Sequence, residues 1–232
     1  MTLVAAIAGI VGAVVIIIGW IVGILGYNSR TDKPFGRRYS PLTHLVSALG
    51  HATTPRATIF NVCIVIGAIA VGLVFVGVAL LVPDDAIKVV MLIGGIIAAI
   101  AGVLVGIFPS GKPREGSIHH LLFAMGFFIL SAAVVGTFTA FLLFGSARGE
   151  AIAGGLAIPG ILVVLAAALM LIAGLVKIAR DDSDWSVPDL VDNVPQPDPV
   201  PRVMLLPVAE WSYVVLLNLW TVVISVFLLT RL

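Results

Sequence analysis

Residues 58–108 read TIFNVCIVIGAIAVGLVFVGVALLVPDDAIKVVMLIGGIIAAIAGVLVGIF, and two membrane-spanning helices can be read from them. Two apolar runs, 58–82 and 89–108, are separated by the polar sequence Pro83-Asp84-Asp85. Each run has about the 20 residues that are needed to cross the hydrocarbon layer of a bilayer. Because lipid offers no hydrogen-bond partner to a bare backbone, each run must form a helix. The tight connection makes the two helices antiparallel neighbours.

Four further apolar runs of similar length lie outward from this pair, at 3–26, 121–145, 155–178 and 208–230. Hydrophobic residues make up 60% of the chain and charged residues 11%, and the mean hydropathy is +1.19. A soluble domain has roughly a quarter of its residues charged. We therefore predict an all-α polytopic protein of the cell membrane, a bundle of six transmembrane helices that forms one integral membrane domain over 1–232.

Composition also limits the function. The first run is too long for the apolar part of a signal peptide and follows no basic segment, so we expect it to be retained as a helix. The net charge of +1 argues against nucleic acid as a partner. The only cysteine is Cys63, which excludes an intramolecular disulfide. No HExxH, GxSxG, CxxC or P-loop pattern is present, and we expect no cofactor and no bound metal.

The loops alternate between the two membrane faces. Residues 27–57, 109–120 and 179–207 share one side, and the short turns 83–88 and 146–154 share the other side with both termini. We expect function on the long-loop side, where the loops have material to build a site. Ten of the Lys and Arg residues lie there against three on the other side, which predicts cytoplasmic long loops and external termini.

A short amphipathic helix is predicted within the first long loop, over 40–51. Ser40 suits its N-cap and Gly50 its C-terminal cap. An apolar face is predicted from the helical spacing of Leu42, Leu45, Val46 and Leu49, and a polar face from His44, Ser47 and His51. Such a helix is either interfacial with solvated histidines, or it places His44 or Ser47 in a headgroup-binding or catalytic site.

Two adjacent histidines, His119 and His120, open the fourth apolar run. Imidazole is the side chain best suited to general-base catalysis near neutral pH. Adjacent helical residues point about 100° apart, so we expect one histidine to face inward and the other to lie at the interface.

Glu210 lies inside the last apolar run, just before Trp211. A carboxylate at membrane depth is costly and usually faces the bundle interior with a partner. Two alternatives follow. Either the carboxylate is functional, or it forms an interhelical hydrogen bond to Asn61 or a histidine, with Trp211 as an ordinary interfacial aromatic. Polar residues that continue roughly the same helical face are Asn218, Thr221 and Ser225. The topology thus predicts one cluster beneath the long-loop surface, formed by Ser47, Asn61, His119 or His120, and Glu210.

Three segments carry a family resemblance: YSPLTHLVSALGHATTPRATIFN at 39–61, GIFPSGKPREGSIHHLLFAMGFF at 106–128, and AEW at 209–211. With them, the whole chain resembles the family catalogued as domain of unknown function 998, which is distantly similar to DRAM-type and GPI-remodelling membrane proteins. The resemblance implies lipid handling and cytoplasmic termini, the opposite orientation from the charge count. The family's recurring positions match Ser47, Gly50, Asn61, Phe108, Pro109, His119 or His120, and Glu210.

Three functions are compatible with these observations. The first is binding or enzymatic modification of a membrane lipid, with a histidine (His119 or His120) as base and Glu210 as its orienting group or a proton carrier. Headgroup contacts would then come from His44, Ser47, Asn61, Arg37, Arg38 and Arg56. The second is transport of a small solute or of protons along Glu210, Asn218, Thr221 and Ser225. The third is a scaffold whose glycine-rich helices bind a second copy or another membrane protein.

Overall fold

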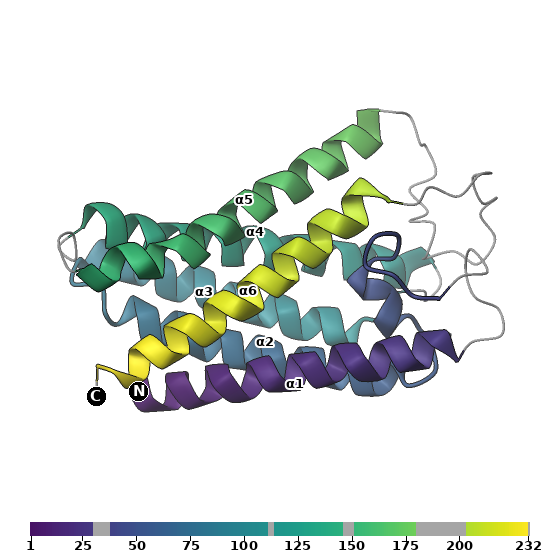
Figure 1. Cartoon of the computed structure of the whole chain (residues 1–232), viewed down its shortest axis with the longest axis horizontal. Coiled ribbons are helices and arrows are strands. Elements are labelled where there is room, and N and C mark those ends of the chain that lie inside the picture. The colour runs from purple at the N-terminus through teal and green to yellow at the C-terminus, as the bar shows by residue number, and fades with distance from the viewer. Residues whose placement is uncertain (30–37, 111–113, 146–150, 180–202, 232) are drawn as a thin grey trace.

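The computed structural model describes residues 1–29, 38–110, 114–145, 151–179 and 203–231. Within these residues the chain forms six long α-helices and one short 3-10 helix, η2, and no strand. The long helices run back and forth along the longest axis of the molecule (Figure 1). Their bounds are α1 Thr2–Asn28, η2 Val46–Gly50, α2 Ala57–Ala79, α3 Asp85–Ile107, α4 Arg114–Phe144, α5 Ala151–Ala179 and α6 Leu205–Leu229.

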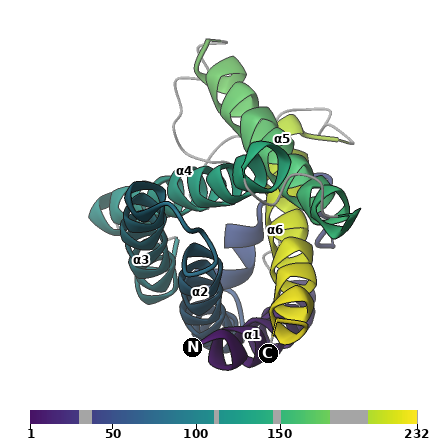
Figure 2. The same ribbon diagram turned by 90° about the vertical axis from the view of Figure 1, so that its left-hand side faces the viewer.

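The six long helices form a ring. Each helix contacts the next one along the chain, and α1 contacts α6 to close the ring (Figure 2). The two termini lie together at one end, and η2 lies near the other (Figure 1). All six helices are long and apolar enough to cross a membrane. The predicted six-helix membrane bundle is therefore confirmed, and the chain is a multi-pass integral membrane protein.

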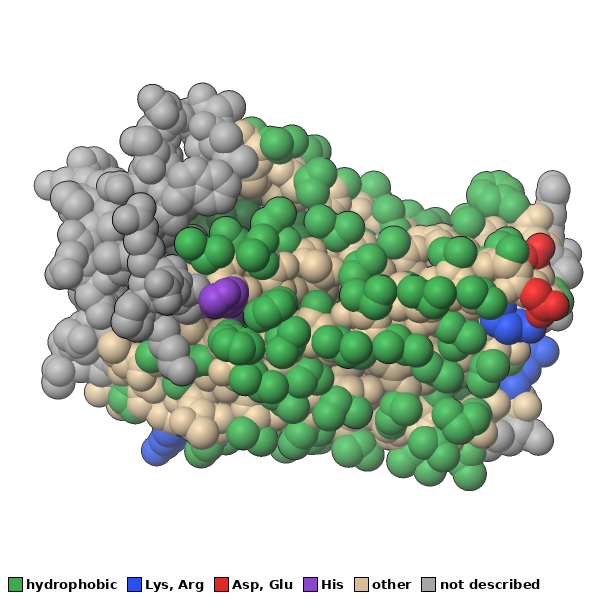
Figure 3. All heavy atoms as spheres, turned by 180° about the vertical axis from the view of Figure 1, so that it is seen from behind, with side chains coloured by type: hydrophobic (Ala, Val, Ile, Leu, Met, Phe, Trp, Pro, Cys, Tyr) green, Lys and Arg blue, Asp and Glu red, His purple; other side chains and the backbone are tan. Residues whose placement is uncertain are grey.

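The side chains of α1 show an arrangement suited to lipid rather than water. Its large aliphatic residues point outward, so that the exposed set includes Ile7, Val11, Ile18, Ile21 and Leu25. Its inward face carries small residues, namely Ala5, Gly9, Gly12, Ala13, Gly19 and Gly23. Small residues let membrane helices approach closely, while lipid tails solvate the large ones. Figure 3 shows the result, an apolar surface with the charged side chains near the two ends.

Several glycines of the glycine-rich helices lie at contacts between neighbouring helices of this bundle. A Cβ atom added at Gly19 would lie 2.7 Å from the Cβ of Cys63, so this glycine lets α1 approach α2. At Gly102 it would lie 2.8 Å from the Cβ of Ala68, where α3 approaches α2. Contacts within one chain therefore account for these small residues.

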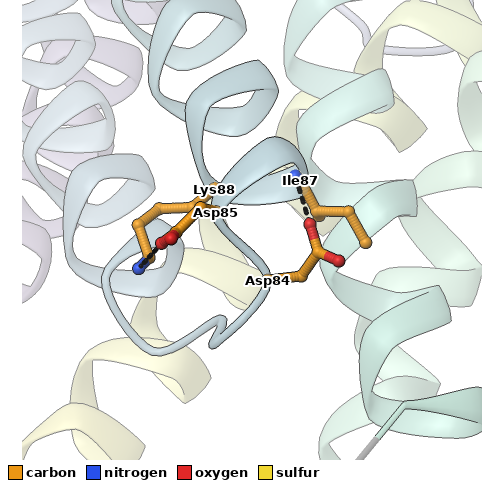
Figure 4. Close-up of polar contacts among 4 residues, drawn as sticks. All are labelled: Asp84, Asp85, Ile87 and Lys88. Atoms are coloured by element: carbon orange, nitrogen blue, oxygen red, sulfur yellow. Dashed lines mark hydrogen bonds and ion pairs between the residues drawn. The ribbon is translucent and has the colours of Figure 1, made fainter.

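The helix bounds differ from those of the apolar runs: α3, α4, α5 and α6 begin earlier than predicted, whereas α2 ends at Ala79, before the predicted end at 82. α3 begins four residues before the predicted span 89–108, because Asp84 caps it. The Asp84 Oδ1 atom accepts a hydrogen bond from the N–H of Ile87 at 2.9 Å, and Lys88 pairs with Asp85 at 2.9 Å (Figure 4). A capping carboxylate satisfies an N–H group that the helix itself cannot, so a polar first turn continues the helix beyond the apolar span.

The half of the bundle nearest the termini is filled by a large apolar core. Trp220 and Phe75 are fully buried there, with ring centroids 5.9 Å apart, and Ile224 and Leu228 continue the core along α6. The other half, nearest η2, is packed differently and holds the candidate site.

Candidate functional site

The first loop does not form the predicted amphipathic helix over 40–51. The Ser40 carbonyl accepts the N–H groups of Thr43 and His44 at 3.0 and 2.8 Å, which makes a single turn. Leu45 is then extended, with φ −65° and ψ 153°, and only Val46–Gly50 is helical. Ser40 is therefore not a helix N-cap, and Gly50 is the last residue of η2 rather than its cap.

Contacts from distant segments override the local pattern. Tyr39 donates a hydrogen bond from its hydroxyl to the Leu45 carbonyl at 2.8 Å. Trp211 donates from Nε1 to the hydroxyl oxygen of Tyr39 at 2.9 Å. Trp211 is only 8% exposed, so the expectation of an interfacial aromatic is wrong. These bonds hold the chain extended at Leu45, where a continuous helix would otherwise pass.

The expectation of solvated histidines in this loop is also wrong. His44 and His51 are 0% and 2% exposed. The His44 ring packs against two aromatic rings that also contact each other, with centroid distances of 5.1 Å to Tyr27 and 5.2 Å to Tyr39. The predicted apolar face is incomplete as well, because Leu42 is exposed. The imidazoles thus fill the packing around η2 instead of facing water.

Glu210 and Asn61 bind the two ends of η2. The Glu210 Oε2 atom accepts a hydrogen bond from the N–H of Val46, the first residue of η2, at 2.9 Å. The Asn61 Nδ2 atom donates to the carbonyl of Gly50, the last residue, at 3.1 Å. Helix ends leave N–H and C=O groups without partners inside the helix. One partner of the Glu210 carboxylate is thus a backbone N–H of the first loop.

The two adjacent histidines are separated as predicted, one inward and one outward. His120 is 8% exposed, and its Nδ1 atom donates to the Phe108 carbonyl at 2.8 Å. This bond ties the start of α4 to the end of α3. His119 is exposed, and its ring packs beside those of Phe108 and Phe123.

A cavity of about 100 Å³ lies inside the helix ring beneath η2. We refer to the end of the cavity beside η2 as its mouth. Its lining comes mainly from α2, α4 and α6, with residues of η2 at the mouth and two residues each from α1 and α3. The polar residues that line it are Ser47, Asn61, His120, Glu210 and Asn218. Apolar residues form most of the remaining lining, among them Ile64, Val71, Phe127, Val214 and Leu217.

The lining residues of α6 and those of α4 each follow helical spacing. On α6 they are Glu210, Val214, Leu217 and Asn218, and on α4 they are His120, Ala124, Phe127 and Phe128. Both sets have the spacing i, i+4, i+7 and i+8, which marks one face of a helix. Each wall therefore begins with a polar residue at the mouth and continues with apolar residues, and the α6 wall ends with a second polar residue, Asn218.

Most of the predicted cluster does come together in this cavity. Ser47, Asn61, His120 and Glu210 all line it, whereas His119 faces outward. His44 packs against the tyrosines rather than in the lining. Arg38 and Arg56 are exposed and are not lining residues. Arg37 lies outside the described residues, and so do residues 181–198, a stretch rich in aspartate.

Residues 6–229 match the family described as "Protein of unknown function (DUF998)". The chain belongs to this family. No curated protein and no solved structure matches it. The family resemblance seen in the three segments is thus confirmed, and the function must be argued from the cavity itself.

Two residues of the site were not among the predicted site residues. Ser110 donates from its hydroxyl to the Ser47 carbonyl at 2.9 Å and so fixes the middle of η2 from the α3–α4 connection. Trp20 of α1 lines the cavity and packs edge-on against Trp211, with ring centroids 5.3 Å apart. A lone serine and a tryptophan in an apolar run give no local signal, because their roles arise only when α1, α3 and α6 meet.

Proposed function

We propose that this protein, in the cell membrane, binds a lipid-like amphiphile in the cavity beneath η2. The headgroup would lie at the mouth among Glu210, Asn61 and His120, and the apolar part would run along Val214 and Leu217. The supporting observation is the lining itself, which is polar beside η2 and apolar toward the bundle centre. A ligand with one polar end and one apolar end matches both parts of the lining. Because the cavity has a volume of about 100 Å³, only the part of a long acyl chain next to the headgroup would lie inside it.

The chemistry of the mouth favours a headgroup that donates hydrogen bonds. Glu210 lines the cavity, and its carboxylate oxygens accept hydrogen bonds. None of the described Lys or Arg residues lines the cavity. An ammonium or hydroxyl headgroup is therefore the best match for the interior. A phosphate would be placed outside the mouth, at the end of the bundle where Arg38 and Arg56 are exposed.

Binding is better supported than transport. Thr221 and Ser225, which would continue a transport path beyond Asn218, are fully buried. Each donates its hydroxyl to a carbonyl of its own helix, at 2.8 and 2.7 Å. Next to them Trp220 and Ile224 belong to the apolar core. A pure scaffold would have a packed interior, whereas this bundle encloses a cavity.

The test uses two adjacent valines of α6 as a matched pair. Val214 lines the cavity, whereas Val215 points outward and is 44% exposed. The probe is lysophosphatidylethanolamine with a brominated acyl chain, which quenches tryptophan fluorescence on contact, and Trp20 lies in the cavity wall. In detergent, wild type and Val215→Phe should be quenched saturably, while Val214→Phe should lose this quenching because phenylalanine fills the site.

Thermal unfolding of each variant shows whether it is folded, and Trp20→Phe assigns the signal. Lipids that co-purify with the wild type are identified by mass spectrometry and should be depleted in folded Val214→Phe. Equal quenching of the two folded valine variants would overturn the proposal.

A further inference from the structure

Asn218 is the lining residue of α6 that lies farthest from the mouth, and it has an unusual environment. The side chain is 8% exposed, and its Oδ1 atom is buried without a hydrogen-bond partner among the described residues. Buried polar groups nearly always have such a partner. Thr221, one turn further along α6, illustrates the rule through its bond to the Leu217 carbonyl. Asn218 is thus a buried carboxamide that faces a cavity and lacks the partner it needs.

Water is a poor candidate for that partner. A buried water molecule usually makes about three hydrogen bonds to polar groups. Apart from Asn218 itself, the lining residues beyond the mouth are apolar or glycine, among them Val71 of α2, Phe127 of α4 and Leu217 of α6. A hydroxyl that is tethered to a bound chain does not need these additional partners.

We infer that the amphiphile of the proposed function carries a second polar group, a hydroxyl, partway along its apolar chain, and that Asn218 binds it. Glu210 and Asn218 are separated by eight residues of α6, which is about 12 Å along the helix axis. Val214 and Leu217 line the cavity between them. The ligand class is therefore an amphiphile with a donor headgroup, an apolar spacer of about this length, and a hydroxyl. A hydroxyl both donates and accepts, so it suits either orientation of the carboxamide.

This inference rests on the proposed function, and the experiment separates the two. Octylamine and 8-aminooctan-1-ol compete against the brominated probe for wild type, Asn218→Leu and Thr221→Val. The two competitors differ only in the terminal hydroxyl. The quantity compared is the affinity for the amino alcohol divided by the affinity for octylamine. We expect this ratio to be at least tenfold higher in wild type and in Thr221→Val than in Asn218→Leu. Asn218→Leu should keep or improve its affinity for octylamine, because leucine preserves the side-chain volume.

Chain length gives a second readout that a merely structural asparagine would not produce. The competitors are 6-aminohexan-1-ol, 8-aminooctan-1-ol and 10-aminodecan-1-ol, each compared with the alkylamine of the same chain length. In wild type, the gain in affinity from the hydroxyl should be largest at one chain length. In Asn218→Leu the peak should be absent. If Asn218→Leu does not fold, Asn218→Ser serves instead, since its shorter side chain should shift the peak toward a longer chain.

If the alkylamines and amino alcohols compete but Asn218→Leu keeps the wild-type hydroxyl preference, the inference fails and the proposed function stands. If the brominated probe itself shows no saturable quenching in wild type, the proposed function fails, and the inference fails with it.

Discussion

Gly50 and Asn61 are so close that a Cβ atom added to Gly50 would lie 2.3 Å from the Asn61 Oδ1 atom. The same two residues form the hydrogen bond that binds the end of η2 to α2. A Cβ at this position would displace the Asn61 side chain from its hydrogen bond and would lie 2.9 Å from the Phe60 ring, so the glycine permits the close approach of η2 to α2.

Gly50→Ala should therefore push η2 away from α2 and break its bond to Asn61. We expect a loss of about 1–3 kcal/mol in the free energy of unfolding, which is typical of overpacking, together with weaker probe binding. Gly174→Ala is the matched control, because a Cβ there meets no atom within 4 Å. It should leave stability unchanged or raise it by up to about 1 kcal/mol, since alanine favours helix over glycine. Equal thermal unfolding curves for the two variants would contradict the role of Gly50.

Substitutions at Glu210 should separate its structural role from its role in binding. Glu210→Leu removes the acceptor of the Val46 N–H and should cost about 1–3 kcal/mol of stability, the penalty for an unsatisfied buried donor. Glu210→Gln keeps an oxygen acceptor and should change stability by less than about 1 kcal/mol, yet it loses the negative charge. Competition with octylamine should show at least tenfold weaker binding to Glu210→Gln. Unchanged octylamine affinity in this folded variant would exclude a headgroup contact by the carboxylate.

His119 and His120 form a second matched pair. His120→Ala removes a buried side chain and the bond to the Phe108 carbonyl, so we expect a loss of about 2–4 kcal/mol in stability. His119→Ala alters an exposed side chain and should stay within about 0.5 kcal/mol of wild type. Thermal or chemical unfolding in detergent measures both. A larger effect at His119 would show that the assignment of the inward histidine is reversed.

The orientation in the membrane can be tested because Cys63 is buried and gives little background labelling. By the charge count, cysteine at exposed Arg56 should be shielded from a membrane-impermeant maleimide in intact cells, and cysteine at exposed Thr230 should be labelled. Permeabilised cells should label both. The reverse pattern in intact cells would instead support the cytoplasmic termini that the family resemblance implies.

The fold could be predicted from sequence because a bilayer imposes a length on every apolar run and requires its backbone to be helical. Even the meeting of Asn61, His120 and Glu210 follows largely from topology, since each lies at the same end of its helix. The conformation of the first loop could not be predicted in this way. The partner of Val46 lies 164 residues away, and no local pattern contains that information. The burial of His44 likewise depends on Tyr27 and Tyr39, which the sequence alone did not place around it.

The bond between Val46 and Glu210 has a consequence for biosynthesis. The ribosome completes the first loop long before it translates the last helix, so the N–H of Val46 lacks this acceptor while α2 to α5 are being inserted. Docking of η2, and with it closure of the ligand chamber, is therefore completed only after α6 arrives, although the bonds from Asn61 and Ser110 to η2 come from segments that are translated earlier. A nascent chain arrested before residue 210 would hold the chamber open to the headgroup region, a stage at which an amphiphile could enter before the bundle is sealed.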